Sequence, residues 1–406
     1  MDRKGRTFGQ NALHLRSVFS RDRLSPDRRT FDDLVKIWLR RFKVLESQPK
    51  RIVFVVIDTV KMRWIAARLM RGRGGDFLSK ADRVHELAPG ERSSSRPAVY
   101  SEADLEKIRK IEPRRSWDIE QVLIKGAPMD HRPTLSYEMS DVLISGAYLY
   151  KGGLRGRYGA SNNGLLGAPQ GEWRELDSAQ LVTCRVGSEH FGHFMWDNLP
   201  MELLPGPRDH PITLSALPRW HEEGYRKVFG MAAPPVVARG RVKKLTIYSD
   251  VGQNAFRAAR YQELRERARR FVCGDGPLPD RRGVYIMRGR GGEHRELVNE
   301  VEIARELKAE GFVIIDPDKM GGEEITRLSM GARVVAGVEG SHIAHALFSV
   351  ANNGSFLIIQ PPDRFSMVYK EFTDRLGLSY AFLVGDPVDN GFKVEPDRLK
   401  RLLERL

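Results

Sequence analysis

Cysteine is scarce in this 406-residue chain, which contains only Cys184 and Cys273, in unrelated surroundings. Two cysteines exclude a disulfide framework, and they also exclude a zinc site built from thiolates alone. So low a cysteine content suits a reducing compartment. We therefore expect a cytoplasmic protein.

Long apolar runs are missing as well. The longest strongly apolar run, residues 52–57, is far shorter than the ~20 residues that a membrane-spanning helix needs. The chain opens with MDRKGRTFGQ, and no apolar stretch follows these charges, so a secretory signal is not expected. The sequence predicts a protein that neither spans a membrane nor is exported by that route.

Acidic residues are outnumbered: 53 Asp and Glu stand against 67 Lys and Arg, and the formal net charge is +14. Half of this excess lies in residues 1–50, where a basic amphipathic helix is predicted from Thr30 onward. Such an arm can contact the anionic inner face of a membrane, dock on the next domain, or remain a solvated tail. A nucleic-acid-binding protein is an alternative function that the basic charge suggests. No recognition helix, zinc finger or RNP-type motif is present, so we predict no nucleic-acid partner.

The composition favours packed globular domains, because 41% of the residues are hydrophobic and 406 residues are enough for two domains. Residues 91–97 read as a loop, and GDGPLP at 274–279 is the best candidate for a linker. Before that linker we predict a strand over 51–58 that feeds a helix ending at Met70, short strands within 100–180, a strand over 241–249 and a helix over 255–270.

After the linker, strands and helices alternate in short units. This alternation predicts an α/β domain with a parallel, doubly wound sheet. The predicted strands are 284–287, 312–315, 333–337, 356–359 and 380–384, and the predicted helices are 296–310, 322–330, 341–350, 365–376 and 396–406.

Ligands of an open parallel sheet bind beyond the carboxyl ends of its strands, and two such ends carry suitable residues. The first is RGRGGEHRELVNE, which starts at Arg288. Its glycines allow close approach of the backbone, and Arg288 and Arg295 can neutralise a diphosphate. Arg295 and Asn299 are four apart, so we expect them to share the face of a helix that begins in this loop. A Gly- and Arg-rich loop can also be a solvated turn.

The second strand end is GVEGSHIAH, residues 337–345. Gly340 and Ser341 are predicted to open a helix whose N–H groups can hold a phosphate. Glu339 can bind ribose or sugar hydroxyls, or it can be a charge that favours the helix start. His342 and His345 lie one turn apart, which is more often a packing arrangement than a ligand pair.

The first half contributes EHFGHFMWDN, the most unusual local sequence in the chain. If it is helical, Glu189, His193 and Asp197 share one face at spacings of four, and His190 and Asn198 are neighbours around the side. A histidine held by a carboxylate is a suitable general base for a hydroxyl acceptor near neutral pH. The alternative is an aromatic-rich helix whose polar groups satisfy one another.

A metal site is a second alternative for this stretch. His190, His193 and Asp197 are ligand types that zinc or iron accepts, which would suit a metal-dependent hydrolase. Their spacing does not match a standard metalloprotease pattern, and no cysteine or third histidine stands nearby. We therefore predict no metal.

Three motifs, in their order and spacing, resemble glycosyltransferase family 61. They are His-Phe-x-His-Phe at 190–194, a strand ending in Arg288 that is followed by Arg-x-x-x-Asn-Glu at 295–300, and Gly-x-x-Gly-Ser at 337–341. Weaker similarity extends from about residue 80 to about 385. At 339 this chain has Glu where many members of the family have His.

The resemblance implies an α/β, GT-B-like fold of two Rossmann-like domains, here with a basic N-terminal helical extension. It implies inverting transfer from a nucleotide-sugar donor to a glycan or lipid-linked glycan acceptor, with no cofactor or metal required. Bacterial-type members are associated with capsular or other surface polysaccharides. The expected organisation is a basic arm over 1–50, an acceptor-side domain over 51–279, a nucleotide-sugar domain over 280–385 and a C-terminal helix over 386–406.

We expect His193, or a carboxylate of the same stretch (Asp197 or Glu189), to take the proton of the acceptor hydroxyl while charge develops on the leaving diphosphate. A relative that binds the donor without turnover remains an alternative. The resemblance matches Arg288, Arg295, Asn299, Glu300, Gly340, Ser341 and His345 to the donor side, and His190 and His193 to the histidines of the first domain. From the residues themselves we add Glu339 to the donor-binding candidates, and His190 and Asn198 to the acceptor side.

Overall fold

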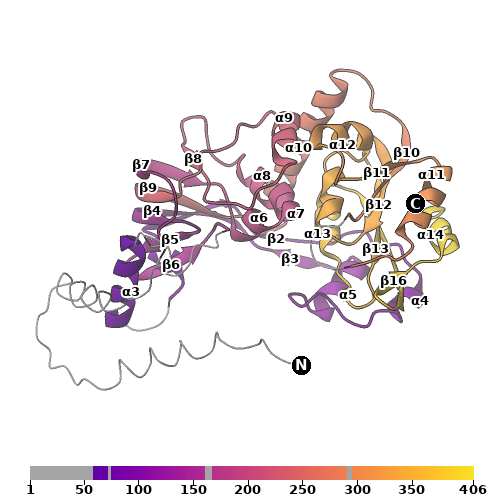
Figure 1. Cartoon of the computed structure of the whole chain (residues 1–406), viewed down its shortest axis with the longest axis horizontal. Coiled ribbons are helices and arrows are strands. Elements are labelled where there is room, and N and C mark those ends of the chain that lie inside the picture. The colour runs from indigo at the N-terminus through magenta and orange to yellow at the C-terminus, as the bar shows by residue number, and fades with distance from the viewer. Residues whose placement is uncertain (1–57, 72–74, 161–166, 290–294) are drawn as a thin grey trace, which may run out of the picture. The chain divides into compact units, whose positions relative to one another are not determined.

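The computed structural model describes residues 58–71, 75–160, 167–289 and 295–406 (Figure 1). The predicted arm and helix within 1–50, and all but the last residue of the strand predicted over 51–58, lie outside the described residues. Helix α3 (Thr59–Arg71) confirms the helix predicted to end at Met70. Within the described ranges, no helix combines the length and the apolar character that crossing a bilayer requires.

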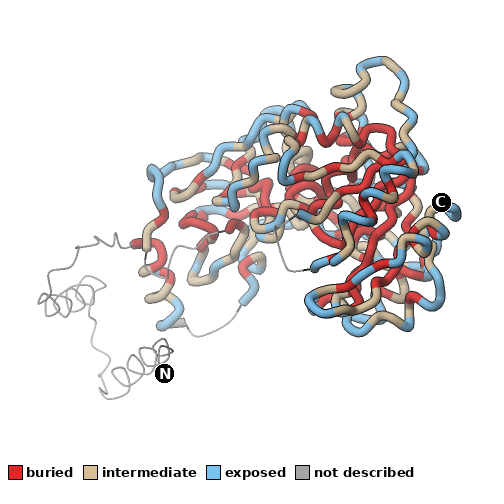
Figure 2. Tube along the Cα trace, turned by 45° about the vertical axis from the view of Figure 1, so that its right-hand side comes forward, coloured by how far each residue is buried: buried red, intermediate tan, exposed pale blue. Residues whose placement is uncertain are grey.

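Five parallel strands form the sheet that was predicted for the C-terminal part. Their order is β11-β10-β12-β13-β14, so the chain moves to one side of β10 first and then to the other. The chain is buried along most of these strands (Figure 2). The strands are β10 (Arg281–Ile286), β11 (Phe312–Ile315), β12 (Ala332–Val338), β13 (Ser355–Gln360) and β14 (Ser379–Val384).

Helices cover both faces of this sheet, as a doubly wound fold requires. Successive residues of a strand point to opposite faces. In β10, Val284 and Ile286 pack in one hydrophobic cluster with residues of α12 (Gly322–Ser329) and α13 (Val368–Arg375). Tyr285 packs in another, with residues of α11 (Glu300–Ala309) and α14 (Pro396–Leu403).

Two predicted helices differ from the structure. The helix predicted over 296–310 begins only at Glu300, so Arg295 and Asn299 do not share a helix face. The cause is a hairpin that was not predicted, β15 (Asp386–Val388) with β16 (Gly391–Lys393). Its Phe392 exchanges backbone hydrogen bonds with residues 296 and 298, which holds this segment extended. The helix predicted over 341–350 is a short 3-10 helix, η4 (Ser341–Ala346).

The first half of the chain forms a seven-stranded mixed sheet, in the order β6-β5-β4-β9-β7-β8 with β1 also on β4. Its pairs are antiparallel around β4, and parallel only where β7 meets β8 and β9. The described residues therefore contain one doubly wound sheet, and the second Rossmann-like domain implied by the resemblance is not a sheet of parallel strands. The strands are β1 (Arg83–Ala88), β4 (Thr134–Ser145), β5 (Tyr148–Lys151), β6 (Leu154–Arg157), β7 (Trp173–Leu181), β8 (Pro211–Ile212) and β9 (Arg239–Ser249).

The helices between the two sheets include α9 (Glu222–Phe229), α10 (Ala255–Cys273) and the short helical turns that contain the 189–198 stretch (Figure 1). The helix predicted over 255–270 is confirmed by α10. The first residues of the predicted 91–97 loop form strand β2 (Glu91–Ser93), which pairs with β3 (Met129–His131).

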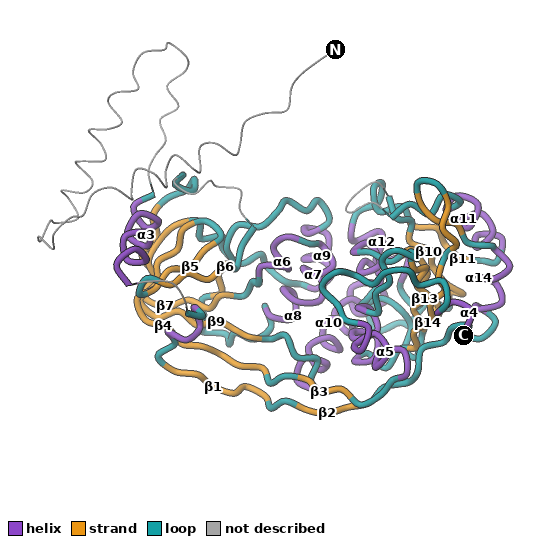
Figure 3. Tube along the Cα trace, turned by 90° about the horizontal axis from the view of Figure 1, so that it is seen from below, coloured by secondary structure: helices purple, strands orange, loops and turns teal. Residues whose placement is uncertain are grey.

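Residues 98–125 lie beside the parallel sheet although they belong to the first half of the sequence. Val99 bonds through its backbone to Tyr380 and Phe382 of β14, and α4 (Glu102–Leu105) and α5 (Trp117–Lys125) lie next to this sheet (Figure 3). The predicted boundaries at 279 and 385 stay predictions, and this segment shows that contacts cross the first of them.

Candidate functional site

The strand order places two loops side by side at the carboxyl edge of the parallel sheet. Strands β10 and β12 are hydrogen-bonded neighbours, and the chain leaves them toward opposite sides, to β11 and to β13. Arg288 follows β10, and Glu339, Gly340 and Ser341 follow β12. The crevice beyond such a switch in strand order is where ligands bind in doubly wound folds.

A cavity of about 760 Å³ opens at this edge. It is lined from the sheet side by residues after β10, β12 and β13, and from the other side by the 189–198 stretch. Nine of the predicted site residues line it: Glu189, His190, His193, Arg288, Arg295, Glu339, Gly340, Ser341 and His345. Asp197, Asn198, Asn299 and Glu300 are not among its lining residues.

Three arginines, Arg288, Arg295 and Arg364, gather around the Glu339 carboxylate on the sheet side of the cavity. The Glu339 carboxylate accepts from Arg295 at 2.8 Å and from Arg364 at 3.3 Å, and Arg295 also donates to the Glu339 backbone oxygen at 3.1 Å. Burial raises the pKa of Glu339, although Arg295, Arg364 and Arg288 oppose this effect. Glu339 Oε2 therefore pairs with two arginines of the cavity, and the binding of ribose or sugar hydroxyls by this carboxylate stays a prediction.

Arg288 is positioned by its backbone and by its side chain. Its N–H donates to Glu300 Oε1 at 2.7 Å, and its guanidinium lies 3.2 Å from His342 Nδ1. Burial and the neighbouring Arg288 and Arg295 hold the pKa of His342 well below its ordinary range, so His342 is neutral. A neutral ring can accept from Arg288 at Nδ1.

Asn299 and Glu300 support the loop from behind. Asn299 donates to the Val394 backbone oxygen at 2.9 Å and accepts from the Val394 N–H at 3.2 Å, so it ties the loop to the β15–β16 hairpin. Glu300 also accepts from the Tyr285 hydroxyl at 3.2 Å. In the matched motif, Arg295 reaches the cavity while Asn299 and Glu300 hold the loop that carries it.

The 189–198 stretch is not one continuous helix. Helix α6 (Arg185–Glu189) ends where His190 is extended, α7 (Phe191–His193) follows, and a π-helical turn, η3 (Phe194–Asn198), completes the segment. The prediction that three polar groups meet on one face is therefore wrong for Glu189. Its carboxylate accepts from Arg157 at 2.6 Å instead, at the rim of the cavity.

His193 and Asp197 are brought together as predicted. Asp197 Oδ2 lies 2.6 Å from His193 Nδ1, and Asp197 Oδ1 accepts from Arg257. Burial raises the pKa of Asp197, but Arg257 and His193 more than offset this and hold it below its ordinary value. Asp197 is thus an ionised carboxylate between a histidine and an arginine.

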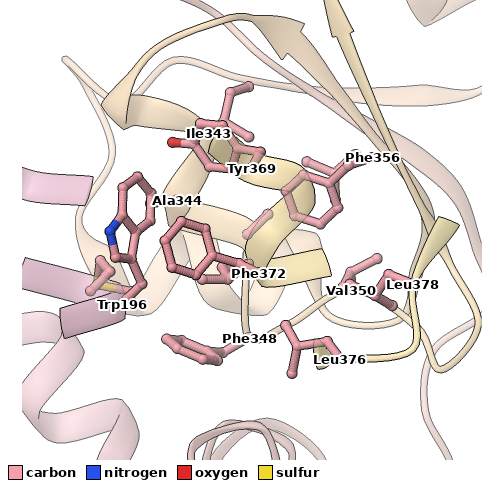
Figure 4. Packing of buried hydrophobic residues seen from close by; sticks show 14 of the residues in the cluster. Trp196, Ile343, Ala344, Phe348, Val350, Phe356, Tyr369, Phe372, Leu376 and Leu378 are labelled. Atoms are coloured by element: carbon pink, nitrogen blue, oxygen red, sulfur yellow. The ribbon is translucent and has the colours of Figure 1, made fainter. Parts of the chain in front are cut away.

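The aromatic members of the same stretch anchor it to the parallel sheet. Trp196 is buried, stacks on Phe372 with ring centroids 4.5 Å apart, and meets Tyr369 edge-on at 5.1 Å. Figure 4 shows Trp196 beside these two rings of α13. This packing fixes η3, and with it Asp197, against the elements that line the cavity.

The remaining predicted residues take different places. Asn198 is buried in a network with Thr183 and Cys184, away from the cavity. His345 lies in the cavity wall, where its Nδ1 is 2.6 Å from the Tyr225 hydroxyl and its ring stacks on Phe191 at 4.3 Å. Burial first, and then His221 and His342, hold the pKa of His345 well below its ordinary range.

Residues 191–357 match the family model described as Glycosyltransferase 61. This stretch is a glycosyltransferase family 61 domain. The match confirms the resemblance seen in the three motifs. It runs from Phe191, beside the predicted base, to Leu357 in β13, and it includes residues from both sides of the cavity, whereas Glu189, His190 and Arg364 of the lining lie outside it. A comparison with curated proteins finds no match.

Members of glycosyltransferase family 61 are glycosyltransferases, so the match over residues 191–357 indicates glycosyltransferase activity for this domain. The family match gives no support to a hydrolase or to a nucleic-acid-binding protein. In the part of the chain that the structure describes, no three His, Cys, Asp or Glu side chains are arranged to hold a metal ion. The His190 and His193 rings are 6.0 Å apart, centroid to centroid.

The sequence did not identify several residues that line this cavity. Arg364 follows strand β13 and lines the cavity, so the rule used for Arg288 would have found it. His221 and Glu112 line the cavity from loops without a motif. Arg257 lies in a helix with six arginines, and no sequence signal separates it from the others.

Proposed function

We propose that this protein is an inverting glycosyltransferase that moves a sugar from a nucleotide-sugar donor to a hydroxyl group of a glycan acceptor. The observation that carries the proposal is the cavity at the β10–β12 switch point, with arginines on its sheet side and the His193–Asp197 pair on the other. One wall is suited to an anionic leaving group and the other to a proton acceptor.

The positive side chains on the sheet side of the cavity indicate where the donor binds. Arg288, Arg295 and Arg364 line the cavity, and Glu339 contributes the carboxylate that pairs with two of them. Guanidinium groups bind phosphate oxygens through two parallel N–H donors. We assign the diphosphate of the donor to this wall, where positive side chains supply the charge stabilisation that a divalent cation supplies in other enzymes.

The chemical step is a single displacement at the anomeric carbon. The acceptor oxygen forms a bond to that carbon as the bond to the diphosphate oxygen breaks, and the electron pair of the broken bond leaves with the nucleoside diphosphate. The proton of the acceptor hydroxyl passes to His193, whose ring is 30% exposed and lines the cavity. The arginine wall stabilises the charge that appears on the leaving group.

The wider assignment follows from the family resemblance. It comprises a GT-B-like arrangement of an acceptor-side part and the nucleotide-sugar part, and a role in the assembly of surface or capsular polysaccharide. A cytoplasmic location, with peripheral contact of the basic N-terminal region at the inner membrane face, belongs to the same proposal.

A binding screen tests the donor assignment. A ligand that binds the folded state raises the midpoint of thermal unfolding by mass action. We expect one member of a panel of nucleoside diphosphates and nucleotide sugars to raise it, equally with and without EDTA. Arg288→Ala should abolish the shift. Arg282→Ala, an exposed arginine of β10 paired with Glu310, is the matched control and should keep it. No shift with any nucleotide would contradict the proposal.

Turnover tests the base. With the nucleotide sugar that the screen identifies, His193→Ala combined with Asp197→Ala should reduce release of nucleoside diphosphate by at least ~100-fold. Activity of the double variant close to that of the wild type would remove this pair from the mechanism. NMR of the product should show inverted anomeric configuration.

A further inference from the structure

Arg257 is a fully buried arginine that reaches the predicted base from a distant part of the sequence. It lies on α10, and its side chain is 1% exposed. It donates to Asp197 Oδ1, to the Trp196 backbone oxygen at 2.6 Å and to the Tyr261 hydroxyl at 2.7 Å, and it also bonds to the Asp250 backbone oxygen. Contacts to both Trp196 and Asp197 fix the position of η3 relative to α10.

The charges around Arg257 are balanced in pairs. The nearby Arg260 donates two hydrogen bonds to the Asp250 carboxylate, at 2.7 and 2.8 Å. Arg257 lies 4.0 Å from Asp250, and its close carboxylate partner is Asp197. A buried charge is tolerated only when it is paired and hydrogen-bonded, so Arg257 and Asp197 depend on each other.

We propose that Arg257 is a positioning residue for His193, acting through Asp197. The proposal rests on the assignment of His193 as the base. Arg257 keeps Asp197 ionised and holds its Oδ1, which leaves Oδ2 to accept the proton of His193 Nδ1. The ring then carries its lone pair on Nε2, and Nε2 is the atom that accepts the proton of the acceptor hydroxyl. Asp197 orients the base and does not itself serve as the base.

The position of the proton also resolves a competition at Nδ1. Trp196 Nε1 lies 3.0 Å from the same nitrogen, and it can donate there only if Nδ1 carries no proton. An ionised Asp197 at 2.6 Å favours the proton on Nδ1. Without Arg257, Asp197 can take up a proton, and the Trp196 N–H can then bond to a bare Nδ1. Arg257 thus selects one of two tautomers.

NMR of the full-length protein labelled in its histidine rings tests this inference without a substrate. The His193 signal is identified by its absence in His193→Gln. In the wild type we expect the Nδ1–H tautomer. In Arg257→Gln we expect the Nε2–H tautomer to become populated. Arg265→Gln is the matched control: it removes a buried arginine of the same helix that bonds to Val350 and Asn352 instead of Asp197, and it should leave the tautomer unchanged.

Arg257→Lys covers the case in which Arg257→Gln does not fold. It keeps the positive charge beside Asp197 but loses the planar guanidinium group, so the Nδ1–H tautomer should persist while the hydrogen bonds to Trp196 and Asp197 weaken. A folded Arg257→Gln protein with the wild-type tautomer of His193 would overturn the inference. Unchanged turnover in His193→Gln would instead contradict the base assignment, so the two failures are distinguishable.

Discussion

The carboxylate of Glu300 accepts a hydrogen bond from the backbone N–H of Arg288 at 2.7 Å, and so joins the two ends of the loop between β10 and α11. The same oxygen accepts from the Tyr285 hydroxyl at 3.2 Å. Burial raises the pKa of Glu300, and the Arg288 N–H and Tyr285 hydroxyl oppose this rise. Glu300 therefore sets the direction in which Arg288 leaves the sheet.

Glu300→Ala should destabilise the protein and also release Arg288. Leaving the Arg288 N–H without its acceptor is expected to cost about 1–3 kcal/mol of unfolding free energy. The thermal shift produced by the nucleotide should be lost as well. Glu300→Gln keeps an acceptor for the Arg288 N–H, so it should retain most of the stability and most of the thermal shift produced by the nucleotide. Val301→Ala, which shortens an exposed side chain next to Glu300 in the same helix, is the control. A full nucleotide shift in Glu300→Ala would show that Arg288 does not need this contact.

Gly340 is required by the closeness of Arg288. A Cβ atom at this position would lie 2.1 Å from Arg288 Nη1, and φ is +151°, a conformation that side chains rarely adopt. We expect Gly340→Ala to displace Arg288 and to weaken nucleotide binding at least tenfold, measured by calorimetry. Gly321→Ala is the control, because no atom lies within 4 Å of its added Cβ. Equal affinities in the two variants would contradict the arrangement.

Trp196 should be a large contributor to stability. It is 3% exposed and joins η3 to the aromatic side chains of α13 (Figure 4). Trp196→Ala leaves a cavity and is expected to cost about 3–5 kcal/mol, measured by denaturant unfolding. Trp173→Ala, which removes an indole that is 42% exposed on β7, should change stability by less than about 1 kcal/mol. Similar decreases in unfolding free energy in both variants would show that the buried packing of Trp196 contributes no more to stability than an exposed indole does.

Acid should weaken the fold through its buried histidines. The pKa of His345 lies well below its ordinary range, so the ring stays neutral in the folded state while the unfolded chain takes up a proton near pH 6.5. The unfolded state then binds more protons, and the unfolding free energy falls as the pH drops below about 6.5. His342 acts in the same direction.

His345→Gln should reduce this pH dependence by up to about 1.4 kcal/mol per pH unit between pH 6 and pH 5, measured by unfolding at several pH values. Glutamine can keep a polar partner for the Tyr225 hydroxyl. His85→Gln, on the exposed strand β1, should leave the slope as it is. A wild-type slope in His345→Gln would show that this ring does not carry the effect.

The parallel sheet and the cavity residues at its carboxyl edge could be predicted from sequence because both depend on local patterns. Apolar runs of four to six residues separated by helical segments determine parallel strands, and the residues that follow a strand must lie at its carboxyl end. Arg288 and Gly340 were found in this way. The predicted helix face of Arg295 and Asn299 failed because residues 296 and 298 bond to Phe392, almost 100 residues further along the chain.

The sequence by itself determined the alternating strands and helices of the parallel sheet, the motifs at the strand ends and the family that these motifs indicate. Only the tertiary structure decided which charges meet. Glu189 forms an ion pair with Arg157, and Asp197 forms one with the buried Arg257. Glu339 pairs with Arg295 and Arg364. The physical reason is that a buried charge takes whichever opposite charge the packing brings to it, and sequence spacing carries no record of contacts between distant segments.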